Sequence, residues 1–119
     1  WMDRYNLLNS MFNIADLVLS LYDISNLSNT ILEALICGKP VLTIDDGSTK
    51  YLLKNNYNAI LVKLDDDLIR SAAFEILKVY NSVDILNDLK NNAFISSKNI
   101  LSWEDRMKIE INSVLNLKR

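Results

Sequence analysis

Short apolar runs alternate with helical patterns along this chain, and this alternation limits the possible folds more than any other feature. The runs DLVLSLY, PVLTI and AILVK, at residues 16–22, 40–44 and 59–63, have the length and composition of buried strands. A helix is expected between the first two runs, and further helices are expected after the third. Strands that alternate with helices favour a parallel sheet with helices packed on its faces. The sequence therefore predicts an α/β fold.

The expected helices follow from apolar residues at a spacing of three or four and from capping residues. Gly38 lies where a glycine often ends a helix, and Ser102 precedes two acids that suit the start of one. The acids of residues 65–67 suit the positive end of a further helix. Helices are predicted over residues 2–13, 29–36, about 65–80, 82–97 and 102–117, with a short one from Ser48 or Thr49 to about Lys54.

Charge and residue content exclude several classes of function. With 119 residues, the chain is long enough for one domain with one core. The net charge of −2 and the scattered lysines give neither the basic face of a nucleic-acid-binding protein nor a polybasic membrane patch. The single cysteine, Cys37, fits a reducing compartment, and no run reaches the length of a membrane span. The absence of histidine removes most zinc sites and every mechanism with a histidine base. The sequence shows no cluster of metal-ligand residues, and neither a metal nor another cofactor is predicted.

The polar loop before the second predicted helix is the candidate binding site. In open α/β sheets, ligands lie beyond the carboxyl ends of the strands, where helix N-termini point. Ser25, Asn26, Leu27 and Ser28 occupy this position, and their backbone amides lead into a helix that begins near Asn29-Thr30. Such amides can bind a phosphate group without a lysine. A loop without glycine is a weak signal by itself, and an ordinary surface loop would have the same composition.

Glu33 is the carboxylate closest to this loop in the predicted helix. It lies among apolar residues, so a buried carboxylate there would need a partner, and the hydroxyls of a ribose are suitable. Taken alone, Glu33 is more often a solvated helix residue. Lys39 is a weaker candidate for a diphosphate ligand, because it follows the glycine at the far end of the helix. Trp103 fits a hydrophobic anchor for the last helix better than a sugar-stacking platform.

Three strings together resemble family 4 glycosyltransferases, which are retaining enzymes with two Rossmann-like domains (the GT-B fold). They are ADLVLSLY at residues 15–22, LEALICGKPV at residues 32–41 and LSWE at residues 101–104, and the predicted strand at residues 58–62 also matches. The resemblance covers nearly the whole chain. It implies a Rossmann-like parallel sheet with flanking helices, forming part of the C-terminal, donor-binding domain over residues 1–119. It also implies that residues from about 98 to 119 form a helix that packs back on the domain.

The resemblance also assigns roles to particular residues. The family holds the donor between two glutamates separated by seven residues, and the second, which binds the ribose, maps onto Glu33. The first maps onto Ser25, which carries no charge, and Asp23 lies two residues too early to replace it. The family's glycine-rich loop maps onto Asn26, Leu27 and Ser28, which would face the diphosphate together with Asn29 and Thr30. The catalytic residues and the sugar stay open.

The resemblance implies a complete enzyme that transfers a hexosyl group from a UDP- or GDP-linked sugar to a glycan or lipid acceptor, as in polysaccharide biosynthesis. Its acceptor-binding N-terminal domain and the Arg and Lys that clamp the diphosphate are absent from this sequence, so we expect the 119-residue chain alone to be inactive. No nucleic-acid partner is expected. A cytoplasmic location is expected, with peripheral association at the inner face of the membrane as one option for the whole enzyme.

Two alternatives belong to other classes. A degenerate, non-catalytic binding module is favoured by the serine at position 25 and by the missing upstream domain. A sugar-nucleotide epimerase of the same two-domain fold is disfavoured, because those enzymes usually rely on histidine and this chain has none.

Overall fold

The strands and helices follow one another largely in the predicted order. The computed structural model describes residues 4–22 and 28–117. Its elements are α1 (Arg4–Ile14), β1 (Val18–Ser20), α2 (Asn29–Ile36), β2 (Val41–Ile44), β3 (Ala59–Val62), α3 (Leu68–Tyr80), α4 (Val83–Ser97) and α5 (Trp103–Asn116).

The three described strands form one parallel sheet in the order β1-β2-β3. Ser20 of β1 pairs with Thr43 of β2, and Thr43 pairs with Leu61 of β3. The carboxyl ends of all three strands therefore meet at one edge of the sheet. The α/β fold with a parallel sheet and flanking helices is confirmed.

The two faces of the sheet carry separate apolar clusters. Because side chains alternate along a strand, Val41 and Leu42 point to opposite faces. The cluster on the α2 face contains Phe12, Ile31, Ala34, Leu35, Val41, Leu53, Ala59 and Ala93. The cluster on the α3 face contains Leu42, Ile60, Val62, Ala72, Val79 and Leu89. Burial of these side chains is the main force that holds the helices on the sheet.

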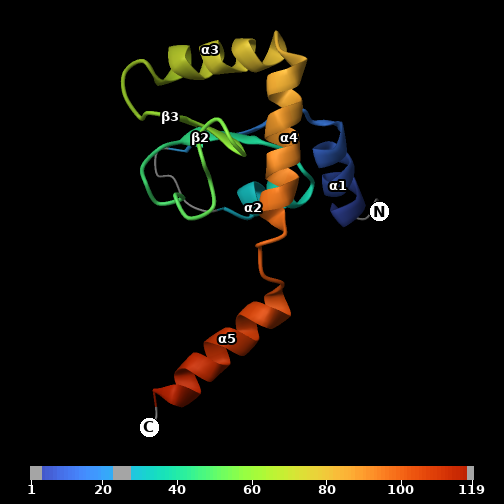
Figure 1. The fold of residues 1–119 in the computed structure, drawn as a ribbon, viewed down its shortest axis with the longest axis vertical. Helices are drawn as coiled ribbons and strands as arrows, with labels where there is room; N and C mark the ends of the chain where they lie inside the picture. Colours follow the sequence, from blue (N-terminus) through green and yellow to red (C-terminus); the bar gives the residue numbers. More distant parts are fainter. Residues whose placement is uncertain (1–3, 23–27, 118–119) are drawn as a thin grey trace.

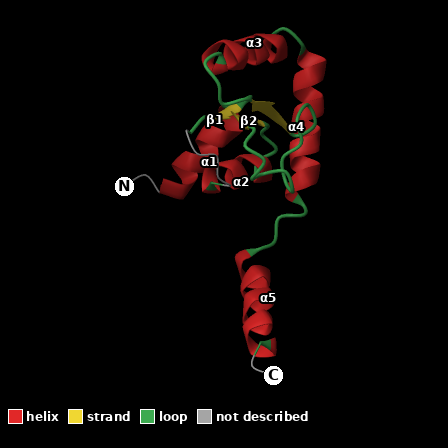
Figure 2. Cartoon of the chain, turned by 90° about the vertical axis from the view of Figure 1, so that its left-hand side faces the viewer, coloured by secondary structure: helices red, strands yellow, loops and turns green. Residues whose placement is uncertain are grey.

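Helix α4 runs past the amino ends of the strands and links both faces (Figures 1 and 2). Its Lys90 Nζ lies 2.6 Å from Asp16 Oδ1, just before β1. The hydrogen bond from Lys90, and then its charge, hold the pKa of Asp16 below the usual value. The carboxyl edge of the sheet is left to the loops that follow each strand.

Asn58 ties the start of β3 to α4 and is almost completely buried, with 1% of its surface exposed. Its amide nitrogen donates to Leu52 O at 2.8 Å and to Ser96 Oγ at 2.9 Å. Its side-chain oxygen accepts from Lys54 N at 2.8 Å. A buried amide with these partners is stabilising, because each of its polar atoms keeps at least one hydrogen-bond partner on leaving water.

Helix α2 has the predicted bounds, and both of its ends have identifiable signals. Ser28 accepts a hydrogen bond from Ile31 N at its start. At its end, Gly38 N donates to Leu35 O at 2.9 Å and Lys39 N donates to Ala34 O at 2.8 Å. This pair of bonds is a Schellman motif, which places Gly38 in the left-handed region at φ = +67°.

One predicted helix is not formed, and the first predicted helix is formed but buries little of its surface. Residues 48–52 form turns and residues 53–54 are irregular, where a short helix from Ser48 or Thr49 to about Lys54 was predicted. The carbonyl of Thr49 accepts from Leu52 N and Leu53 N, which makes a single helical turn. In α1, Phe12 is buried, whereas Leu7 and Met11 remain about half exposed, at 48% and 58%. Only one narrow stripe of α1 meets the rest of the described chain.

Helix α5 does not pack back on the sheet and its flanking helices (Figures 1 and 2). None of its described residues is buried, and Trp103 is 72% exposed, so its expected role as an anchor was wrong. Ser102 caps the helix, and exposed ion pairs such as Arg106–Glu110 run along it. Capping and neighbouring charges can define such a helix locally without fixing its tertiary position.

The left-handed turn at Gly38 gives a test of how α2 is held. A Cβ added there would lie 3.5 Å from Phe94 Cβ, an ordinary contact, so the cost of Gly38→Ala comes from the backbone angle. We expect this substitution to lower the free energy of unfolding by about 1 kcal/mol in chemical denaturation. Gly38→Asn should cost less, because asparagine tolerates this region better than alanine does. Equal stability of the alanine variant and the wild type would contradict the assignment.

Candidate functional site

The first turn of α2 lies where β1 leads into its crossover helix, at the carboxyl edge of the parallel sheet. Ser28, Asn29 and Thr30 form this turn, and none of them is buried. Three other predicted site residues, Ser25, Asn26 and Leu27, lie outside the described residues, as does Asp23. The structure therefore shows the helix start but not the loop before it.

The backbone amides of this turn divide into two groups. Ile31 N and Leu32 N donate to the Ser28 carbonyl at 3.1 and 3.2 Å, and Ile31 N also approaches Ser28 Oγ. The amides of Asn29 and Thr30 are the first two of the helix, and an α-helix offers no acceptor of its own to these positions. The first turn contains no acidic residue, so no carboxylate of the helix offsets its positive end. The turn can thus accept an external anion.

Glu33 lies on α2, four residues after Asn29, and this spacing corresponds to a rise of about 6 Å along the axis. It is half-buried and faces α1 rather than the sheet. With Asn9 and Cys37 it lines a shallow, mostly apolar groove of about 200 Å³, completed by Leu8, Phe12 and Ile36. The groove and the open helix start lie on the same short helix, so a ligand longer than a phosphate could contact both.

Two buried hydroxyl groups beside α2 were not predicted as site residues. Ser20 and Thr43 are 4% and 1% exposed and are paired across β1 and β2. Thr43 Oγ1 donates to the Ser20 carbonyl at 2.8 Å. Within the described part of the chain, Ser20 Oγ is buried and has no hydrogen-bond partner. The serine inside the apolar run at residues 16–22 was the available signal, but the run was interpreted only as a buried strand.

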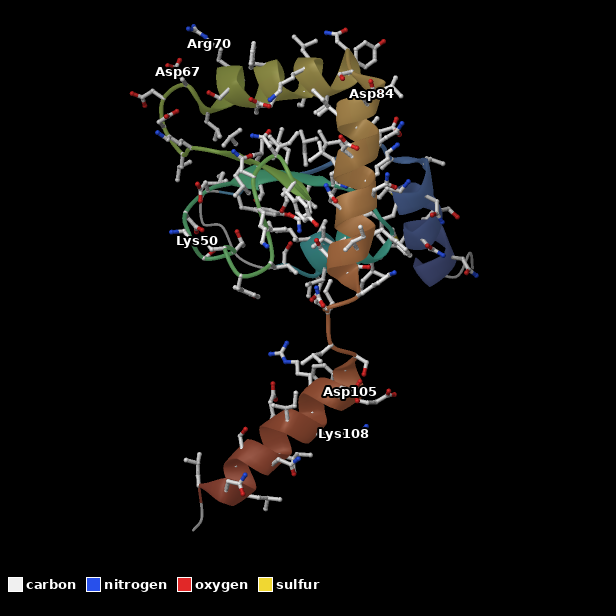
Figure 3. The ribbon with its side chains drawn as sticks, in the orientation of Figure 1. Lys50, Asp67, Arg70, Asp84, Asp105 and Lys108 are labelled. Carbon is white, nitrogen blue, oxygen red and sulfur yellow. The ribbon has the colours of Figure 1, made fainter. Side chains whose placement is uncertain are left out.

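The lysines have different positions relative to this edge. Lys39 Nζ donates to the carbonyl of Asn13 at 3.0 Å, near the end of α1, so it satisfies a helix terminus far from the α2 start. Lys50 extends from the loop after β2 (Figure 3).

Among residues 4–22 and 28–117, no group of three or more acids, cysteines or histidines could hold a metal ion. None of the helices in these same ranges is long and apolar enough to cross a membrane.

The parallel sheet, its crossover helix and the open helix start define a Rossmann-like α/β domain with the features of an anion site at the sheet edge. A sequence profile described as "Glycosyl transferases group 1" matches residues 2–96. The chain therefore belongs to the group 1 glycosyltransferases.

The chain is also similar in fold to the Anabaena protein Alr3699/HepE, whose crystal structure is a complex with UDP-glucose. The two share 22% sequence identity with a TM-score of 0.65, over 76% of this chain and 25% of that protein. The chain thus spans about a quarter of the length of this GT-B relative. No curated protein matches the chain significantly.

Two substitutions at Ser28 distinguish its role as the cap of α2 from the binding of anions at the start of this helix. Ser28→Ala should lower the free energy of unfolding by about 1 kcal/mol, because the side-chain cap is lost. Ser28→Asp keeps a capping oxygen and adds a negative charge at the positive end of the helix, so it should restore stability. The same added charge should weaken phosphate binding, which isothermal titration calorimetry can measure. An aspartate variant that binds phosphate as well as the wild type does would show that anions bind elsewhere.

Proposed function

We propose that this chain is the donor-binding part of a glycosyltransferase and binds a nucleoside-diphosphate sugar at the start of α2. The observation that carries this proposal is the pair of amides at Asn29 and Thr30, which the helix cannot satisfy, at the carboxyl edge of a parallel sheet. In a group 1 glycosyltransferase, a diphosphate is the anion expected at such an edge. The UDP-glucose complex of the Anabaena relative supports the same class of donor.

Glu33 is the residue proposed to hold the ribose. Its position about 6 Å along the helix from Asn29 suits a pentose next to a diphosphate, and its half-buried carboxylate would accept from two hydroxyls. The undescribed residues Ser25, Asn26 and Leu27, together with Ser28, complete the proposed loop around the phosphates. UDP and GDP are both compatible with these contacts.

In the whole protein, the proposed reaction is retaining transfer of a hexosyl group to a glycan or lipid acceptor, as in family 4 of the glycosyltransferases. The chain's own contribution would be to stabilise the departing diphosphate with fixed amide dipoles, which gain strength as charge develops on the leaving group. The acceptor site and the cations that complete the clamp are expected in sequence upstream of this chain. Cytoplasmic action at the inner face of a membrane is part of the same proposal.

The serine at position 25 supports a second candidate, a glycosyltransferase-like module that binds nucleotides without transfer activity. Replacing a carboxylate with a hydroxyl near the donor sugar removes a charge that the family's enzymes use. The two candidates differ in one assay. Release of UDP from UDP-glucose in the presence of acceptor supports the enzyme, whereas tight binding without release supports the module.

The role of Glu33 can be tested by calorimetric titration of the full-length protein with UDP. Glu33→Gln should weaken UDP binding about tenfold, because a charged acceptor for the ribose hydroxyls is replaced by a neutral one. Its stability should stay within about 0.5 kcal/mol of the wild type, since Glu33 lies outside both apolar clusters.

Glu75→Gln is a matched control, because Glu75 is also half-buried and pairs with Lys78 at 3.1 Å on α3, on the other face of the sheet. It should leave the affinity for UDP unchanged. If both glutamine variants bound UDP equally well, Glu33 would have no part in the site.

A further inference from the structure

Ser20 is the one side chain near the proposed site whose buried polar atom lacks a partner in the described residues. It ends β1 and is 4% exposed, and its Oγ makes no hydrogen bond within the described ranges. A buried hydroxyl without a partner costs free energy, so such groups in a folded protein call for an explanation. The carbonyl of the same residue is satisfied, because it accepts from Thr43 Oγ1 at 2.8 Å.

The alternation of side chains along β1 places this hydroxyl on the face of the sheet that α2 covers. Val18, two residues earlier, packs against the cluster that contains Ile31 and Leu35 of α2. Ser20 points to the same face as Val18, one step nearer to the carboxyl edge. Its register partner Thr43 is likewise aligned with Val41, which also belongs to the α2 cluster. Ser20 therefore lies on the face and at the edge where the first turn of α2 begins.

We propose that the Ser20 hydroxyl is a further ligand of the donor diphosphate and donates a hydrogen bond to a phosphate oxygen held at the start of α2. This inference rests on the proposed function and adds a contact from β1 to the amides of Asn29 and Thr30. Because the hydroxyl is buried, the side chain must rotate, or the chain that covers it must shift, when the donor binds. The hydroxyl then gains a partner that the described residues do not provide.

If the proposal holds, replacing Ser20 weakens the binding of UDP without lowering the stability of the protein. Replacing a serine with a purely structural role would lower the stability instead. In Ser20→Ala the unsatisfied hydroxyl is removed, so the midpoint of thermal unfolding without ligand should stay unchanged or rise. The same variant should bind UDP about tenfold more weakly, because a hydrogen bond to a charged group is lost. Inorganic pyrophosphate should show the same fold-loss, since the contact is to the diphosphate.

Thr43→Val is the matched control from the neighbouring strand. It removes the donor to the Ser20 carbonyl while keeping the side-chain shape, so its unfolding midpoint should fall. Its affinity for UDP should stay within about twofold of the wild type, because Thr43 Oγ1 already has a partner in the protein.

The outcomes of the calorimetric titrations and the unfolding scans on the full-length protein are distinguishable. A stable Ser20→Ala protein with the wild-type affinity for UDP would overturn the inference and leave the proposed function intact. A loss of affinity for UDP but not for pyrophosphate would overturn the assignment to the diphosphate. A destabilised Ser20→Ala protein would mean that the hydroxyl already has a partner, which also contradicts the inference. A wild-type protein that binds neither UDP nor GDP would overturn the proposed function and this inference together.

Discussion

The placement of α2 between two parallel strands is the constraint on which the rest of the structure depends. Because β1 and β2 run in the same direction, the chain must return along the sheet between them, and α2 makes this return. A crossover helix between parallel strands begins at their carboxyl edge and ends at their amino edge. The Ser28 cap and the turn at Gly38 fix the two ends of the helix. The first amides of the helix, which have no intrahelical acceptor, therefore lie at the edge where α/β proteins bind ligands.

The structure separates the groups that stabilise the domain from those that can bind a ligand. At the amino edge, α4 joins the strands through Lys90, Asn58 and its apolar contacts with both clusters. Lys90, Asp16 and Asn58 at this edge all have hydrogen-bond partners within the protein. At the carboxyl edge, the amides of Asn29 and Thr30 have no intrahelical acceptor, and Ser20 Oγ has no partner in the described residues. The contacts that stabilise the domain thus lie at the amino edge of the sheet, and the groups that can bind a ligand lie at the carboxyl edge.

The features that could be predicted from sequence are those that depend on local signals. The three strands lie in mostly apolar runs, and α2 lies between a capping serine and a glycine, so its bounds were predicted correctly. The position of α5 could not be predicted, because its cap and ion pairs define a helix but no tertiary contact. The turns at residues 48–52 were mistaken for the start of a helix, because a capping residue starts a helical turn without ensuring that it continues. The direction in which Glu33 points and the isolation of Ser20 Oγ depend on packing between distant segments, which no local pattern shows.

The central claim is that a nucleoside diphosphate is held by the main chain at the start of α2, and amide chemical shifts measured during a UDP titration test it most directly. The account predicts that Asn29 and Thr30 give the largest shifts, that Glu33 follows, and that residues of α5 stay unchanged. Saturable binding of UDP that leaves the amides of Asn29 and Thr30 unshifted would contradict it.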